Sequence, residues 1–204
     1  MNPAFDVALV VLSVASFAMQ GRRIRQHGAA GVSRSTWLGL LVSVTLWSVY
    51  GVSTRDWTIT ATNVALVGVA VSIILAMARE GAARPRDPLV VGGLTLGLAL
   101  VAVGVVGPGV VGASAATIVV GRIVPQLVDA VRAPDVVGIA VSTWWGNVAN
   151  KVPWAVYGFG VADVWMAWGS LVATVLSLAI VVVVGVRRRR GARQSAYEPV
   201  CADA

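Results

Sequence analysis

The sequence predicts an all-α integral membrane protein with seven transmembrane helices, in which two parallel three-helix repeats are joined by a linker helix. Three observations support this fold class. Hydrophobic residues make up 57% of the 204 positions and charged residues only 12%, against roughly a quarter charged in a soluble domain. The hydrophobic residues form seven long runs, and the second half of the chain repeats a pattern of the first. These features exclude a soluble globular, disordered or disulfide-stabilised fold.

Each run is long enough for a helix that crosses the hydrocarbon layer, which takes about 20 residues. The predicted spans cover residues 4–20, 35–53, 57–78, 88–107, 110–129, 136–158 and 162–186. Helices are expected because lipid leaves the edge of an open sheet without hydrogen-bond partners. The first run is interpreted as a span and not as a cleaved signal peptide, since Asp6 stands near its start and its arginines follow it.

Basic residues are concentrated on one side of the predicted membrane. Thirteen of the 16 Lys and Arg residues fall after spans one, three and five or in the C-terminal tail, and the opposite side has only Arg55. Positive charge favours the cytoplasmic side. We therefore expect a multi-pass protein of the cell membrane, with its N-terminus outside and its C-terminus in the cytoplasm. No segment has the basic, aromatic-interleaved surface of a nucleic-acid-binding module, so no nucleic-acid partner is expected.

Reactive side chains are scarce. Cys201 is the only cysteine and His27 the only histidine. A disulfide, a zinc site and a histidine-based triad therefore have no basis within the chain. We expect no cofactor, no bound metal and no enzymatic activity.

The two halves match when the chain is shifted by 107 residues. Ten identities fall within 26 positions, and three of them are Trp or Tyr. In the first half the matching residues are Gly31, Ser35, Thr36, Trp37, Gly39, Trp47, Val49, Tyr50, Gly51 and Asp56. One extra crossing between two three-helix units gives both units the same orientation. We expect a first repeat over residues 1–79, a linker with the fourth helix over 80–108, a second repeat over 109–187, and a basic, disordered cytoplasmic tail over 188–204.

Short motifs recur within these repeats. They are GVSRSTW (31–37) and WSVYG (47–51) in the first, and Pro125-Gln126, GIAVSTW (138–144) and WAVYG (154–158) in the second. Together with Asp56, Asp163 and Asn63, the motifs resemble the PQ-loop superfamily (also called MtN3/saliva), specifically the SWEET sugar transporters and their half-sized SemiSWEET relatives. The chain departs from the family pattern at Met19-Gln20, where the family has Pro-Gln, and at Ser170, where it has Asn.

The resemblance implies a carrier for a small sugar, with a pocket between the two repeats. Trp47 and Asn63 would form one half of the pocket, since an indole face suits the C–H surface of a sugar ring and an amide suits its hydroxyl groups. Trp154 and Ser170 would supply the other half. The alternative role for Asn63 is a structural hydrogen bond between helices.

Span six contains an unusual polar stretch, WWGNVANKVPW. Asn147, Asn150, Lys151 and Trp154 are related by helical spacing and share one face, which is expected to look inward and to contribute to the substrate site. A charge at Lys151 would favour an anionic or polyhydroxyl ligand. Alternatively, Lys151 extends its long stem to the membrane surface or pairs with Asp163 or Asp56.

Two further groups concern motion. Proline weakens a helix locally, so Pro125 and Pro153 are candidate hinges, and Gln20 and Gln126 are candidate partners for freed backbone carbonyls. The alternative is an ordinary proline at a helix end. A second group consists of the candidate extracellular latch residues, Tyr50, Asp56, Tyr157 and Asp163. The alternative for this group is an aromatic belt with helix caps.

Acidic residues stand only near the predicted helix ends. Ion-driven carriers usually need a buried carboxylate, so the sequence favours facilitated diffusion of a mono- or disaccharide by alternating access, as a uniport without ion coupling. The alternatives are a carrier of the same fold for an amino acid or a vitamin nucleoside, in either case a solute that could be anionic, and a seven-helix receptor or structural membrane protein. The expected partners are the small-molecule substrate and the lipid bilayer, and a homo-oligomer remains open.

Overall fold

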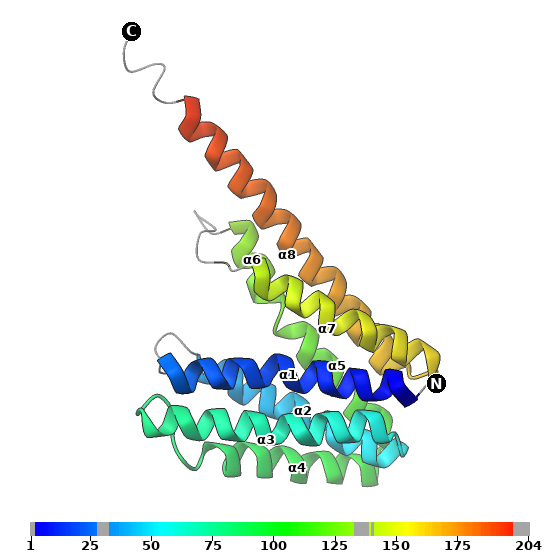
Figure 1. The fold of residues 1–204 in the computed structure, drawn as a ribbon. Coiled ribbons are helices and arrows are strands. Elements are labelled where there is room, and N and C mark those ends of the chain that lie inside the picture. Colours follow the sequence, from blue (N-terminus) through cyan, green and yellow to red (C-terminus); the bar gives the residue numbers. More distant parts are fainter. Residues whose placement is uncertain (1–2, 28–32, 133–138, 140, 198–204) are drawn as a thin grey trace.

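The structure is a computed structural model that describes residues 3–27, 33–132, 139 and 141–197. Within these residues the chain forms eight helices (Figure 1). They are α1 (Pro3–His27), α2 (Arg34–Thr54), α3 (Trp57–Arg79), α4 (Asp87–Val105), α5 (Pro108–Gly121), α6 (Val124–Arg132), α7 (Val141–Gly160) and α8 (Val164–Tyr197). These bounds follow the seven predicted spans, because α5 and α6 together form span five.

Five of the helical segments are long and apolar enough to cross a membrane: α2, α3, α4, the α5–α6 pair and the first part of α8. The remaining two crossings, α1 and α7, have 25 and 20 residues, which is also sufficient length. Helix α7 is less apolar than the others because it contains the Asn147, Asn150 and Lys151 stretch.

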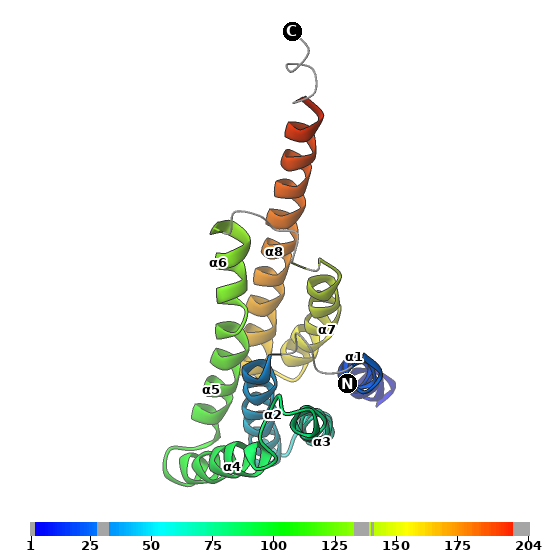
Figure 2. The same cartoon turned by 90° about the vertical axis from the view of Figure 1, so that its left-hand side faces the viewer.

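The helices pack as two similar groups of three. Helix α3 lies between α1 and α2, and α8 lies between α7 and the α5–α6 pair. The groups meet where α2 packs on α5 and, over a shorter stretch, where α1 packs on α7, while α4 covers α2. Figures 1 and 2 show these two groups and α4 beside the first of them. The 107-residue shift relates α1 to the α5–α6 pair and α2 to α7. The contact of α2 with α5 and the contact of α1 with α7 are therefore related by the repeat.

The repeat extends to the local geometry of the two hairpin turns. The Asp56 carboxylate caps α3 by accepting a hydrogen bond from the Ile59 amide, and Asp163 caps α8 in the same way through the Met166 amide, both at 2.9 Å. The residue before each aspartate, Arg55 or Ala162, has a left-handed backbone. The two turns thus share the same cap and the same backbone conformation, as the sequence identity predicts.

Glycine is needed just before each turn because the helices approach closely there. A Cβ atom at Gly51 would lie 2.7 Å from the Thr60 hydroxyl oxygen, and one at Gly158 would lie 2.7 Å from the Cα atom of Ala167. Both distances are shorter than van der Waals contact allows. Gly51 and Gly158 are related by the 107-residue shift, so the same close crossing is built twice.

Span five is interrupted at its centre. Between α5 and α6, Arg122 and Ile123 form a turn, in which the Ile123 amide donates to the Val120 carbonyl at 2.9 Å. Pro125 has no N–H to donate to the Gly121 carbonyl, which it would otherwise reach four residues back. The interruption therefore lies immediately before Pro125.

The C-terminal region differs from the prediction. The expectation of a disordered tail from residue 188 is wrong for residues 188–197, because α8 continues to Tyr197. Arginine is a good helix former, and extending an existing helix avoids the cost of nucleation. The guanidinium groups of Arg187 and Arg188 also donate to the carbonyls of Ala130 and Ile139, at 2.9 and 2.8 Å. The rest of the predicted tail, including Cys201, lies outside the described residues.

An ion pair fixes the start of α4. The Arg34 guanidinium donates two hydrogen bonds to the Asp87 carboxylate, at 2.7 and 2.8 Å. Asp87 also accepts from the Arg84 amide at 2.9 Å. These bonds join the first residue of α2 to the first residue of α4, so both helices begin at the same end of the molecule.

Candidate functional site

The two groups of helices approach each other at the end of the molecule where α1 begins. The charge distribution predicts that this end is extracellular, and we call it the outer end. Helices α1 and α7 lie close there and diverge toward the opposite, inner end (Figure 1). The candidate site residues are distributed along this junction between the groups.

Paired aromatic rings occupy the junction near the outer end. Trp47 and Tyr50 meet edge to face with ring centroids 5.5 Å apart, and Trp154 and Tyr157 repeat this arrangement at 5.6 Å. All four rings are buried in one apolar cluster that contains residues of both groups. The structure therefore brings together the two tryptophans that the sequence singled out.

Ser13 of α1 joins the two groups through hydrogen bonds. Its hydroxyl oxygen accepts from the Trp154 indole N–H at 3.0 Å and from the Asn150 side-chain amide at 3.2 Å. The serine is only 2% exposed. The sequence analysis missed Ser13, because a single serine in an apolar run has no distinguishing pattern and its partners lie more than a hundred positions away.

The polar face of α7 also contacts its own group. The Asn147 side-chain amide donates to the hydroxyl of Ser177 on α8 at 2.7 Å. Ser177 is buried and donates in turn to the Ala173 carbonyl. The asparagines thus bond in two directions, Asn150 toward α1 and Asn147 toward α8.

Asn63 and Ser170 are both buried, but each bonds within its own helix. The Asn63 amide donates to the Ile59 carbonyl at 2.8 Å. The Ser170 hydroxyl lies 3.7 Å from the Met166 sulfur. Neither bond joins two helices. These contacts therefore give no support to the alternative role of Asn63, a structural hydrogen bond between helices.

Lys151 lies on the same face of α7 and is half-buried. Among the described residues it forms no ion pair, and the considered pairing with Asp163 or Asp56 is absent. Its positive charge interacts electrostatically with that of Arg122, at the interruption of span five.

A hydrogen bond closes the outer end of the junction. The Tyr157 hydroxyl lies 2.8 Å from both carboxylate oxygens of Asp56, which belongs to the other group. We call Tyr157 and Asp56 the outer latch. Its repeat-related counterparts, Tyr50 and Asp163, also interact electrostatically. This hydrogen bond joins the two groups at the outer end.

Removing the Tyr157 hydroxyl is expected to weaken the outer latch. A hydrogen bond to a charged group contributes about 1.5–3 kcal/mol, so Tyr157→Phe should lower the free energy of unfolding by about that amount. A double-mutant cycle with Asp56→Asn, measured by unfolding in detergent, separates the latch from the cap that Asp56 also forms. Strictly additive effects of the two substitutions would show that the latch contributes nothing.

The candidate hinge residues have different surroundings. Pro125 and Gln126 are exposed at the start of α6, directly after the interruption of span five. Pro153 is half-buried inside α7, which continues through it. Gln20 belongs to α1, but its side chain lies outside the described part of the chain. The structure thus places one candidate hinge at a helix break and the other within a continuous helix.

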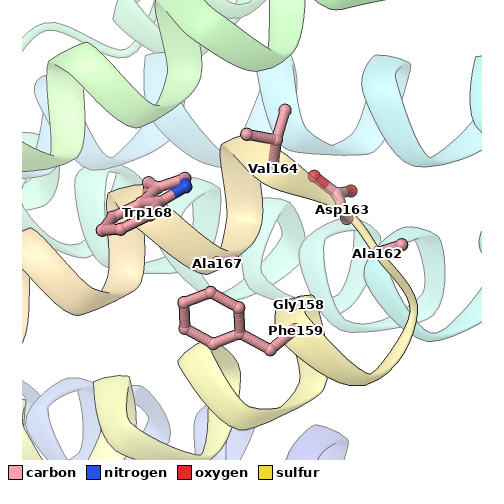
Figure 3. A pocket seen from close by; sticks show the side chains of 7 residues that line it. All are labelled: Gly158, Phe159, Ala162, Asp163, Val164, Ala167 and Trp168. Atoms are coloured by element: carbon pink, nitrogen blue, oxygen red, sulfur yellow. The ribbon is translucent and has the colours of Figure 1, made fainter.

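A shallow pocket lies at the turn between α7 and α8. It is lined by Gly158, Phe159, Ala162, Asp163, Val164, Ala167 and Trp168 (Figure 3). The rings of Phe159 and Trp168 meet edge to face across it, with centroids 5.8 Å apart, and both are about half exposed. Because a single hairpin supplies every lining residue, this pocket is separate from the junction between the groups. Among the described residues, no three His, Cys, Asp or Glu side chains gather as metal ligands would.

Comparisons with known proteins identify the fold. No family model matches the sequence, and no curated protein matches it either. The structure, however, is similar to the solved structure of a eukaryotic SWEET transporter, with a TM-score of 0.73. The similarity covers 91% of this chain and 96% of that chain at 14% sequence identity. The predicted fold class is confirmed: the chain has the all-α, multi-pass membrane fold of a SWEET transporter.

Proposed function

We propose that the chain is a membrane transporter that moves a small sugar by facilitated diffusion, as a uniport without ion coupling. The main supporting observation is the polar seam between the two groups of helices, where Ser13 accepts bonds from Asn150 and Trp154. Polar side chains inside a membrane are costly and therefore usually functional. At this seam they adjoin buried indole rings, a combination that suits a sugar.

The arrangement of the two groups supports a mechanism of alternating access. The outer latch holds them together at one end, and their helices diverge toward the other end. Release of the latch and approach of the inner ends would expose the same seam to the opposite side of the membrane. The interruption before Pro125 provides a place where span five can bend during this exchange. In this proposal Trp47, Asn63, Trp154 and Ser170 contact the sugar.

The lack of ion coupling is supported by the position of the carboxylates. Asp56 and Asp163 cap helices at the outer end, and Asp87 pairs with Arg34 at the inner end. Asp129 lies on the short helix α6 beyond the interruption. None of these four carboxylates bonds to Ser13, Asn150 or Trp154, where a proton or a sodium ion would have to bind. Asp56 reaches the junction only at the outer latch, and Asp6 of α1 has a buried carboxylate oxygen with no hydrogen-bond partner among the described residues.

Uptake into proteoliposomes tests the proposal. Purified protein should take up D-glucose faster than L-glucose, with saturation, and a proton gradient should leave the rate unchanged. Empty liposomes and the Trp154→Ala variant are the controls. Equal uptake of the two enantiomers would rule out a specific sugar carrier, and acceleration by a proton gradient would rule out simple uniport.

A further inference from the structure

Two positive charges lie at mid-depth in the membrane without a carboxylate partner. Lys151 is the eleventh of 20 residues in α7, and Arg122 is the fifteenth of 25 residues in span five. Charged residues at such depth are rare and face the interior of the bundle or a water-filled cavity. Among the described residues, neither side chain takes part in a salt bridge.

Arg122 extends across the junction between the groups. Its Cδ and Nε atoms lie 3.7 and 3.8 Å from the position that a Cβ atom of Gly39 would occupy. Gly39 belongs to α2 in the first group and Arg122 to span five in the second. The arginine side chain, although exposed, thus contacts α2 of the first group at ordinary van der Waals distance.

Lys151 lies on the polar face of α7 that borders the seam. It follows Asn150, which bonds to Ser13 of the first group, and lies four residues after Asn147 and three before Trp154. Its positive charge and that of Arg122 interact electrostatically. Two like charges in a region of low dielectric repel each other strongly, and the repulsion is relieved when an anion binds between them.

The nearest carboxylate on span five does not neutralise the two positive charges. Asp129 lies seven residues after Arg122, which is about 10 Å along a helix axis. It is exposed, and no ion pair joins it to Arg122. The two cations therefore remain available to a ligand.

We propose that Arg122 and Lys151 form an oxyanion-binding subsite, so that the transported solute is a monosaccharide that bears one carboxylate or phosphate group. This inference rests on the proposed transport function and narrows its substrate class. Arginine binds an oxyanion through two parallel N–H donors, and lysine adds a mobile point charge. The indole of Trp154 and the amide of Asn150 lie on the same helix face and suit the sugar ring.

Ligand binding to the purified full-length protein in detergent tests the subsite without requiring transport. D-glucuronate and glucose 6-phosphate are compared with D-glucose by thermal stabilisation, and sodium sulfate at equal ionic strength controls for screening. We expect one or both sugar anions to bind at least tenfold more tightly than glucose, and their ranking distinguishes carboxylate from phosphate. Equal or tighter binding of glucose, or equal stabilisation by sulfate, would overturn the inference.

Substitutions of the two basic residues test whether they bind the sugar anion. Lys151→Gln and Arg122→Gln should each weaken binding of the sugar anion at least tenfold. Arg132→Gln, at the end of the same span as Arg122, is the matched control and should have no effect. Sugar-anion binding that survives in both subsite variants would contradict the assignment.

A measurement on the unaltered protein covers the case in which the variants fail to fold. Uniport of an anion moves charge, so an inside-positive potential should accelerate uptake of the sugar anion into proteoliposomes and leave glucose uptake unchanged. Uptake of glucose without binding of either sugar anion would overturn this inference and preserve the proposed transport function. Binding of a sugar anion without any uptake would overturn the proposed transport function and preserve the anion-binding subsite.

Discussion

Replacing Gly158 with alanine is expected to destabilise the protein by about 3 kcal/mol or more and to lower its melting temperature by about 10 °C. The added Cβ would lie 2.7 Å from the Cα atom of Ala167 and 2.9 Å from the carbonyl carbon of Met166. Both are backbone atoms, so no side chain can move aside, and α7 and α8 would have to separate. Thermal unfolding in detergent measures the effect.

A neighbouring glycine provides the matched control. Gly146 lies on the same helix, and a Cβ there would meet nothing within 4 Å. Gly146→Ala should leave the stability unchanged or raise it slightly, since alanine favours a helix. Equal melting temperatures for the two variants would contradict the close crossing at Gly158.

Trp154→Ala is expected to reduce sugar uptake at least tenfold per folded molecule. Trp154 is 5% exposed, its ring packs on Tyr157, and its indole N–H donates to Ser13 across the junction. The substitution removes both the aromatic face and the bond between the groups. Because truncating a buried tryptophan costs about 3–5 kcal/mol in stability, uptake has to be normalised to correctly folded protein.

Two further variants make this prediction specific. Trp154→Phe keeps an aromatic ring but removes the N–H donor, so its uptake should lie between those of the unaltered protein and Trp154→Ala. Trp145 stands on the same helix with 52% of its surface exposed, and Trp145→Ala should leave uptake nearly unchanged. If Trp145→Ala and Trp154→Ala reduced uptake equally, Trp154 would have no special place in the transport path.

The spans and the repeat could be predicted because their signals are local or internally duplicated. Hydropathy marks each crossing, since a run of about 20 apolar residues has few other uses. The 107-residue shift related Asp56 to Asp163 and Trp47 to Trp154 before their geometry was known. The structure gives each pair the same helix cap or the same ring contact.

Other features depend on contacts between residues far apart in the chain, and these contacts cannot be recognised from a single sequence. Ser13 matters because it meets Asn150 and Trp154 of the other group, and the sequence separation between these partners exceeds a hundred residues. The contact between Arg122 and Gly39 joins residues 83 positions apart, at the interruption before Pro125. Asn63 was expected to face a pocket or to bond to another helix; its amide donates to the Ile59 carbonyl of its own helix, and its contact with a substrate stays a prediction.

Paired distance measurements test the central claim most directly, namely that two equivalent groups of helices move against each other around a shared seam. Spin labels at Val52→Cys and Phe159→Cys report on the outer end, and labels at Ser35→Cys and Ser142→Cys report on the inner end. All four positions are repeat-related and lie within described helices, and Cys201→Ser removes the native thiol. When Tyr157→Phe is introduced to release the outer latch, the outer distance should lengthen while the inner distance shortens. Distances that change in the same direction at both ends, or at neither, would contradict the account.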